Sequence, residues 1–204
     1  TGSDTGSDTG GDTGTTTPVE LLTNGDFSEG DAGSEPTSTW YNNALNIVNG
    51  VSRADVGAAG APHDVNLSGS VTLTPGADYT LVFTARGTEG RVLKAGIGDA
   101  QDPWFNDATD LTLTDGWQTY TMHLNASDGV HGGLFTGASR VLFDMGHDVG
   151  QVDLDNVSLV AGHVGTEDLT GTATADPTDP VVVDPGTGSD TGSDTGGDTG
   201  TTTP

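Results

Sequence analysis

The chain has 204 residues, no cysteine, and a net charge of −25 from 30 acidic and five basic residues. The lack of cysteine excludes disulfides and thiolate zinc sites. So acidic a chain is not expected to bind nucleic acid or an anionic membrane, because both partners require basic patches. No apolar run approaches the roughly 20 residues that span a membrane.

The two ends of the chain carry the same 18 residues. TGSDTGSDTGGDTGTTTP occupies 1–18 and recurs letter for letter at 187–204. These segments contain no large apolar residue, so we predict disordered, acidic linkers at 1–18 and 162–204. The chain opens with these repeats and not with a basic, apolar signal region, so we expect this sequence to be a piece of a longer polypeptide. In that polypeptide, such linkers would join successive modules. Calcium binding by the linker aspartates is the alternative, but the GGxGxD spacing of calcium-binding β-rolls is missing.

The segment between the linkers has the pattern of an all-β domain. Short alternating stretches are separated by turn dipeptides such as Asn49-Gly50 and Pro75-Gly76, and no window of 12 residues has a helical period. This pattern predicts one antiparallel β-sandwich over 19–161. We expect its strands at 19–22, 39–48, 51–56, 63–73, 79–86, 92–98, 110–114, 118–125, 139–145 and 151–160.

Four stretches of this segment resemble a known family. They are LLTNGDFSEG near the start, PHDVNLSGSVTLTPGADYTLVFTARG in the middle, WQTYTMHL, and VDLDNVSLV at the end. Together they are similar to carbohydrate-binding modules of families 4, 9, 16 and 22, with family 4 closest. The resemblance implies a jelly-roll sandwich, a structural calcium ion, and a glycan groove across the concave sheet. Such modules are appendages of secreted bacterial polysaccharide hydrolases.

The resemblance also implies which residues hold the calcium ion. Position by position it suggests Gly25 or Asp26 with Ser28, the turn from Asn49 to Ser52, and Asp155. Ser28 stands where many relatives have glutamate, and a serine is a weaker ligand. The alternative is that Asp26 caps a turn and Asp155 is exposed at a sheet edge.

Aromatic side chains are the first candidates for sugar contacts, because the C–H faces of a pyranose stack on aromatic rings. Trp104 lies in the polar loop DPWFND and has no obvious core to join, so we predict that it is the stacking platform. Trp40 is a weaker candidate of the same kind. Strand alternation places the other aromatic candidates on the predicted core faces: Tyr79, Phe83, Tyr120 and Phe143.

Strand alternation supplies the polar candidates. Arg140 and Asp144 alternate with apolar residues, as Arg86 does on its own strand, so each is predicted to face the ligand or solvent. Asn66 offers both a donor and an acceptor for hydroxyls. His63 occupies a position that is commonly aromatic in the family. A merely solvated sheet face is the alternative for all of these residues.

Catalytic patterns are missing. The five histidines show no HxH or HExxH spacing, and there is no GxSxG or P-loop. Pairs of acids are too common in this chain to indicate a glycosidase. We therefore predict a module without enzymatic activity.

The resulting hypothesis is a monomeric, secreted or cell-surface module that binds one neutral β-glycan chain and targets an attached polysaccharide-degrading enzyme. Segment 19–161 contains 19 of the acids and all five bases, a net of 5 − 19 = −14, which favours a neutral glycan. The family suggests β-1,3-glucan or mixed-linkage glucan, with xylan next. The rival hypothesis is an adhesive or structural repeat of a long surface protein, without a sugar site.

Overall fold

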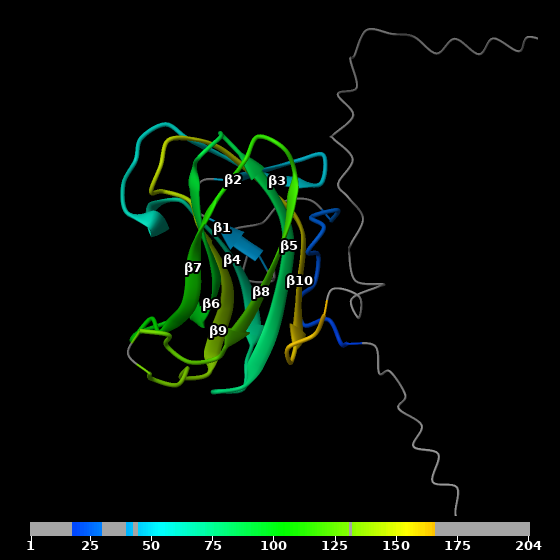
Figure 1. The fold of residues 1–204 in the computed structure, drawn as a ribbon, viewed down its shortest axis with the longest axis vertical. Coiled ribbons are helices and arrows are strands. Elements are labelled where there is room, and N and C mark those ends of the chain that lie inside the picture. Colours follow the sequence, from blue (N-terminus) through cyan, green and yellow to red (C-terminus); the bar gives the residue numbers. More distant parts are fainter. Residues whose placement is uncertain (1–17, 30–39, 43–44, 131, 166–204) are drawn as a thin grey trace, which may run out of the picture.

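A computed structural model describes residues 18–29, 40–42, 45–130 and 132–165; the predicted linkers lie almost wholly outside this part. Two facing sheets make up the described chain (Figure 1). Its single helical element is a 3-10 turn, η1 (Pro62–Asp64), and no described helix is long and apolar enough to cross a membrane. The strands are β1 (Trp40–Asn42), β2 (Leu45–Val48), β3 (Val51–Val56), β4 (Asn66–Thr72), β5 (Asp78–Gly87), β6 (Val92–Asp99), β7 (Asn106–Thr112), β8 (Gln118–Asn125), β9 (Ala138–Asp144) and β10 (Gly150–Ala161).

Each sheet has five antiparallel strands. The front sheet has the order β1-β4-β9-β6-β7, and the back sheet has the order β2-β3-β10-β5-β8. Apart from the consecutive pairs β2-β3 and β6-β7, neighbouring strands in both sheets are separated by other strands in the chain, as in a jelly-roll sandwich. The prediction of an all-β, antiparallel sandwich is confirmed.

The core lies between the sheets and follows from the period of two along each strand. Phe83 of the back sheet packs edge-on against Phe143 of the front sheet, with ring centroids 4.9 Å apart, and stacks on Tyr120 at 5.2 Å. Phe83 and Phe143 are fully buried and Tyr79 is nearly so, which confirms their predicted place in the core.

The predicted strand 39–48 is wrong as a single element. β1 pairs with β4 in the front sheet, whereas β2 pairs with β3 in the back sheet, so the chain changes sheets between them. Alternation within each short piece looks the same from the sequence, and nothing in it marks the crossing.

The predicted strand 63–73 begins three residues too early. Pro62 fixes its own backbone, and the Asp64 carboxylate accepts a hydrogen bond from the Ala61 amide at 2.7 Å, which stabilises the turn η1 instead. The strand near 110–114 begins earlier than predicted, because Asn106 already pairs with Gly98 of β6. The expected first strand at 19–22 is reduced to a single bridge between Glu20 and Val160.

Both ends of the described chain are attached to the back sheet. The Glu20 carboxylate accepts hydrogen bonds from the Leu159 amide, at 2.9 Å, and from the Ser158 hydroxyl of β10. At the other end the Val164 amide donates to the Thr80 hydroxyl at 3.0 Å. The folded part therefore continues past the predicted boundary at 161.

Candidate functional site

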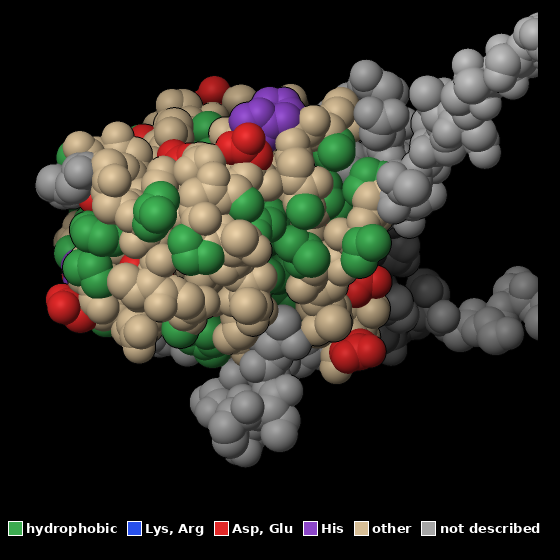
Figure 2. Space-filling model, turned by 90° about the horizontal axis from the view of Figure 1, so that it is seen from below, with side chains coloured by type: hydrophobic (Ala, Val, Ile, Leu, Met, Phe, Trp, Pro, Cys, Tyr) green, Lys and Arg blue, Asp and Glu red, His purple; other side chains and the backbone are tan. Residues whose placement is uncertain are grey.

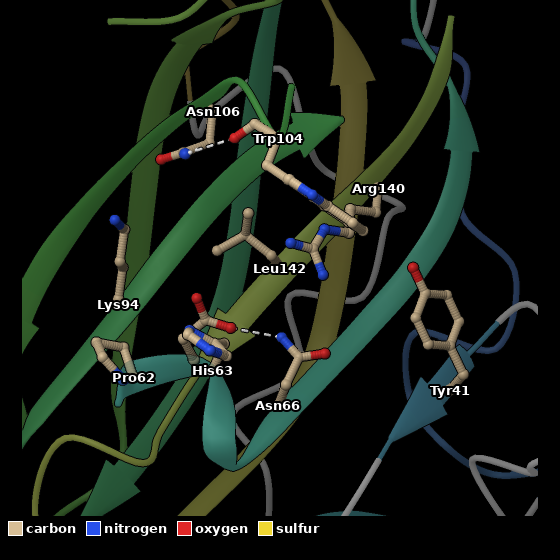
Figure 3. A pocket seen from close by; sticks show the side chains of 10 residues that line it. Tyr41, Pro62, His63, Asn66, Lys94, Trp104, Asn106, Arg140 and Leu142 are labelled. Carbon is tan, nitrogen blue, oxygen red and sulfur yellow. Dashed lines mark hydrogen bonds between the residues drawn. The ribbon is translucent and has the colours of Figure 1, made fainter. Parts of the chain in front are cut away.

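A groove of about 710 Å³ lies on the outer face of the front sheet (Figure 3). Its walls come from the turn η1, from all five strands of the front sheet, and from the loop between β6 and β7. The lining residues are Tyr41, Pro62, His63, Asn66, Lys94, Trp104, Asn106, Arg140, Leu142 and Asp144. The volume falls within the range of pockets that bind small ligands.

An apolar side chain forms the floor of the groove, next to a part of β6 that carries two glycines. Leu142 is at its centre, and the position opposite it on β6 is Gly96, followed two residues later by Gly98. A side chain at Gly98 could not be accommodated without movement, because its Cβ would lie 2.9 Å from the Phe105 carbonyl oxygen. These glycines let β7 and the loop before it pack closely against β6, beside Leu142.

Trp104 stands at one side of the groove with 52% of its surface exposed. Its backbone has φ of 60°, a left-handed conformation that is uncommon for a bulky residue and that costs free energy unless the surroundings enforce it. Hydrogen bonds hold it there: its amide donates to the Gln101 carbonyl at 2.8 Å, and its carbonyl accepts from the Asn106 amide group at 3.1 Å. The fold therefore holds a large ring in the position of a stacking platform.

A chain of side-chain hydrogen bonds crosses the groove from the Trp104 side to the turn η1. Arg140 Nη1 donates to Ser68 Oγ at 3.2 Å, and Ser68 Oγ donates to Asn66 Oδ1 at 2.8 Å. Asn66 Nδ2 in turn donates to Asp144 Oδ1 at 2.5 Å. The network fixes the orientation of each polar group before a ligand arrives.

Five of the seven residues predicted to bind carbohydrate line this groove: His63, Asn66, Trp104, Arg140 and Asp144. Five further lining residues were not predicted: Tyr41, Pro62, Lys94, Asn106 and Leu142. Alternation with the apolar Leu93 and Ala95 places Lys94 on an outward face, but the sequence does not show to which sheet that face belongs. Tyr41 could have been found by the same rule once Trp40 was placed in the core.

The prediction that Trp40 contacts the sugar is wrong. Its side chain is 1% exposed and packs against Phe27, with ring centroids 5.2 Å apart, while Nε1 donates to the Thr23 carbonyl at 2.9 Å. Gly69 makes room for it, since a Cβ there would lie 2.9 Å from the indole ring. Trp40 belongs to the core, and its neighbour Tyr41 faces the groove.

The prediction that Arg86 lies in the groove is also wrong, because β5 belongs to the back sheet. Arg86 Nε is 3.0 Å from the fully buried carboxylate of Asp153, and Arg53 Nε is 2.7 Å from the same group. The Arg86 guanidinium also lies 4.8 Å from the centre of the Trp117 ring. Its alternation with Ala85 correctly indicates the outer face, but of the other sheet.

Replacing Asp153 with asparagine is expected to destabilise the fold by about 1–3 kcal/mol at neutral pH, since two arginines lose their charged partner. Burial alone would raise the pKa of Asp153, but hydrogen bonds from Arg53, Gln151 and Arg86 outweigh it and hold the pKa below its usual value. The stabilisation is therefore complete above about pH 4 and is lost as the pH falls further. Urea titrations from pH 7 to pH 3 measure both effects; an equally steep acid loss in the variant would contradict the assignment.

The residues implied for calcium come together in one place, and none of them lines the groove. A Cβ at Gly50 would be 3.6 Å from the Asp26 carbonyl oxygen, which places the Asn49-Gly50 turn beside Asp26. The Gly25 carbonyl accepts from the Val157 amide at 2.8 Å, and Ser28 Oγ donates to Asp26 Oδ1 at 3.0 Å.

Asp155 completes this cluster. It is 9% exposed rather than open at an edge, and burial, with a smaller contribution from the Asp26 charge, raises its pKa to about 6. In the described part of the chain, no three acidic or histidine side chains converge on one point. Calcium sites nevertheless take several backbone carbonyls, so two carboxylates next to tight turns fit the ion.

A jelly-roll sandwich with an exposed tryptophan over a shallow, hydrogen-bonding groove defines a carbohydrate-binding module. Among the described residues, Asp144 is the only carboxylate that lines the groove, whereas glycoside hydrolysis generally needs two.

Comparison with known proteins agrees with this class. The sequence model of the carbohydrate binding domain of families 4 and 9 matches residues 19–136, and the chain belongs to this family, which is a non-catalytic type of domain. No match was found among the curated proteins.

Solved structures show the same fold. A structure described as "CBM4 structure and function" is 22% identical with a TM-score of 0.53, and the match covers 69% of this chain and 99% of that one. The second N-terminal cellulose-binding domain of Cellulomonas fimi β-1,4-glucanase C is 20% identical with a TM-score of 0.55, covering 73% and 98%. An arabinose-bound α-L-arabinofuranosidase is 12% identical with a TM-score of 0.50, covering 72% of this chain and 27% of that enzyme.

Proposed function

We propose that the groove binds one chain of a β-glycan, with a sugar ring stacked on Trp104 and its hydroxyls bonded by the network from Arg140 to Asp144. The exposed, conformationally constrained Trp104 beside this network is the observation that carries the proposal. Leu142, the apolar side chain at the centre of the groove, suits the apolar face of a pyranose.

The role we propose for such binding is targeting. A module joined to a secreted polysaccharide-degrading enzyme keeps that enzyme at a high local concentration on its substrate, without contributing chemistry of its own. This role places the protein outside the cell or on its surface. The described residues of one chain form the groove, so the proposed binding requires only a monomer.

The backbones that we propose to test first are β-1,3-glucan and mixed-linkage glucan, followed by xylan. A cellulose-derived β-1,4-glucan is added because the Cellulomonas fimi domain is described as cellulose-binding. With one strong stacking platform, we expect a Kd of about 10–100 μM, or about −5.5 to −7 kcal/mol. Isothermal titration with oligosaccharides of each backbone tests this, and failure of every glycan to bind would favour the adhesive repeat that the identical flanking segments also fit.

We also propose that calcium binds at Asp26, the Asn49-Gly50 turn and Asp155, where it stabilises the fold and takes no part in sugar recognition. Bound there, the ion would offset the burial of the Asp155 carboxylate and its repulsion by Asp26. At a hundredfold excess over Kd, an ion that binds only the native state adds about 3 kcal/mol. Gly25 and Ser28 lie beside this cluster and support it through the backbone and the Asp26 side chain.

Chelation should therefore lower the melting temperature of the wild type by several degrees and should not change that of Asp155→Asn. Because folding raises the pKa of Asp155, the calcium-free wild type should lose stability as the pH rises from about 4 to about 6. The variant, which buries no charge at this position, should lack that loss. Melting curves with and without calcium at pH 4, 6 and 7 provide the measurement, and a chelator response that persists in Asp155→Asn would remove this residue from the site.

A further inference from the structure

The few basic side chains of this acidic protein are unequally distributed. Arg53 and Arg86 share Asp153 on the back sheet, and Arg91 donates to backbone carbonyls. Acidic side chains are visible at several points around the end of the sandwich in Figure 2. The two remaining cations, Lys94 and Arg140, both line the groove, and neither forms an ion pair with a described residue.

Lys94 and Arg140 differ in their surroundings. Lys94 stands between Asp144 of β9 and Asp110 of β7 in the register of the front sheet, so two carboxylates on the same face offset its charge. The cross-strand neighbours of Arg140 are Ser70 and Gly98, which are uncharged. The groove is therefore balanced or acidic around Lys94 and positive around Arg140.

The Arg140 guanidinium is held in place, and some of its N–H donors are not used in hydrogen bonds with described residues. Nη1 donates to Ser68 Oγ, and the guanidinium carbon lies 5.5 Å from the centre of the Trp104 ring. Nε is buried and has no hydrogen-bond partner among the described residues. A guanidinium has five N–H donors in a planar fork that matches two oxygens of a carboxylate or sulfate. Figure 3 shows Arg140 beside Trp104, on the opposite side of the groove from His63.

We propose that the sugar unit stacked on Trp104 carries an anionic group, a carboxylate or a sulfate ester, and that Arg140 binds it. This rests on the proposed glycan-binding function and refines it: the backbone stays a β-glycan, and the unit at the Trp104 side is acidic. The net charge of −14 over 19–161 favours a neutral ligand only if every charge of the domain acts equally strongly on the ligand in the groove. Exposed charges more than about 8–10 Å away are largely screened at physiological salt, so the local balance at Arg140 decides.

The experiment compares glycans that differ only in charge. Oligosaccharides of β-1,3- and β-1,4-glucan are titrated against the wild type in three forms: neutral, oxidised at C6 to the carboxylate, and sulfated at O6. We expect one anionic form to bind about ten- to a hundredfold more tightly than the neutral form, the range of a charge-assisted hydrogen-bond pair. The form that gains shows whether the group is a carboxylate or a sulfate. The gain should shrink when sodium chloride rises from 50 to 500 mM.

Variants separate a local contact from the field of the whole protein. In Arg140→Gln the ratio of anionic to neutral affinity should fall to about one, and in Arg140→Lys most of the ratio should remain. The double variant Arg140→Gln/Thr119→Lys restores the net charge on an exposed position of the back sheet and should behave like Arg140→Gln. If the double variant regained the preference, or if wild type bound neutral chains as tightly as anionic ones, the inference would be overturned while glycan binding stood. If no form of either backbone bound, the proposed function would fail with it.

Discussion

Trp104→Ala is expected to weaken glycan binding by about 1–3 kcal/mol, a loss of roughly 5- to 150-fold in affinity, and to leave the melting temperature nearly unchanged. The magnitude follows the loss measured when an aromatic side chain that stacks on a planar ring is removed. Stability is spared because 52% of the side chain already faces solvent and the ring has no place in the core. Isothermal titration and thermal melts on the same preparations give both quantities.

The control for this prediction is Trp104→Phe, which keeps a ring of smaller area and should retain a measurable part of the affinity. A further comparison is Val130→Ala, which truncates a side chain that is 81% exposed and lies outside the groove. That variant should bind like the wild type. Unaltered affinity in Trp104→Ala would place the sugar site elsewhere on the molecule.

Trp40→Ala should have the opposite profile. Removing a fully buried indole is expected to cost about 3–5 kcal/mol of unfolding free energy, on the order of 10–20 °C in melting temperature. The contact with Phe27, the hydrogen bond to the Thr23 carbonyl and the close fit against Gly69 are all lost together. Urea unfolding monitored by circular dichroism measures the cost directly.

Trp40→Phe provides the matched control, because it preserves a ring next to Phe27 and loses the indole hydrogen bond. Its cost should be less than half that of Trp40→Ala. At a temperature where Trp40→Ala remains folded, its affinity for glycan should exceed that of Trp104→Ala. A stable Trp40→Ala that no longer bound sugar would return Trp40 to the groove and contradict its burial.

Local alternation predicted the sandwich well and the assignment of strands to sheets poorly. The alternation of side chains along a strand shows which residues share a face. It therefore correctly placed Arg140 and Asp144 on one face and Phe143 on the other. It does not state which sheet a strand joins. Arg86 and Arg140 have the same kind of alternation, and only the strand order places one on the back sheet and the other in the groove.

The two tryptophans show a second limit. Trp40 and Trp104 both precede another aromatic residue in a polar context, yet one is buried and the other is exposed. The difference comes from residues distant in the chain: Gly69 and Phe27 form a space for Trp40, whereas the left-handed backbone at Trp104 turns that ring outward. Lys94 was missed for a related reason, because its strand shows a groove face only once β6 is known to lie beside β9.

The bridge between Glu20 and Val160 determines how the domain would respond to tension along the chain. The pairing is antiparallel and joins the first described segment to the last strand, so both flanking segments leave the same end of this pair. A pull on the two flanks would open these hydrogen bonds one after another, like a zipper, rather than shear them all at once. The load would reach the back sheet first, and the sheet that carries the groove would stay intact until later. In single-molecule pulling we therefore expect an early, low-force release of the segment around Glu20, with glycan binding preserved after it.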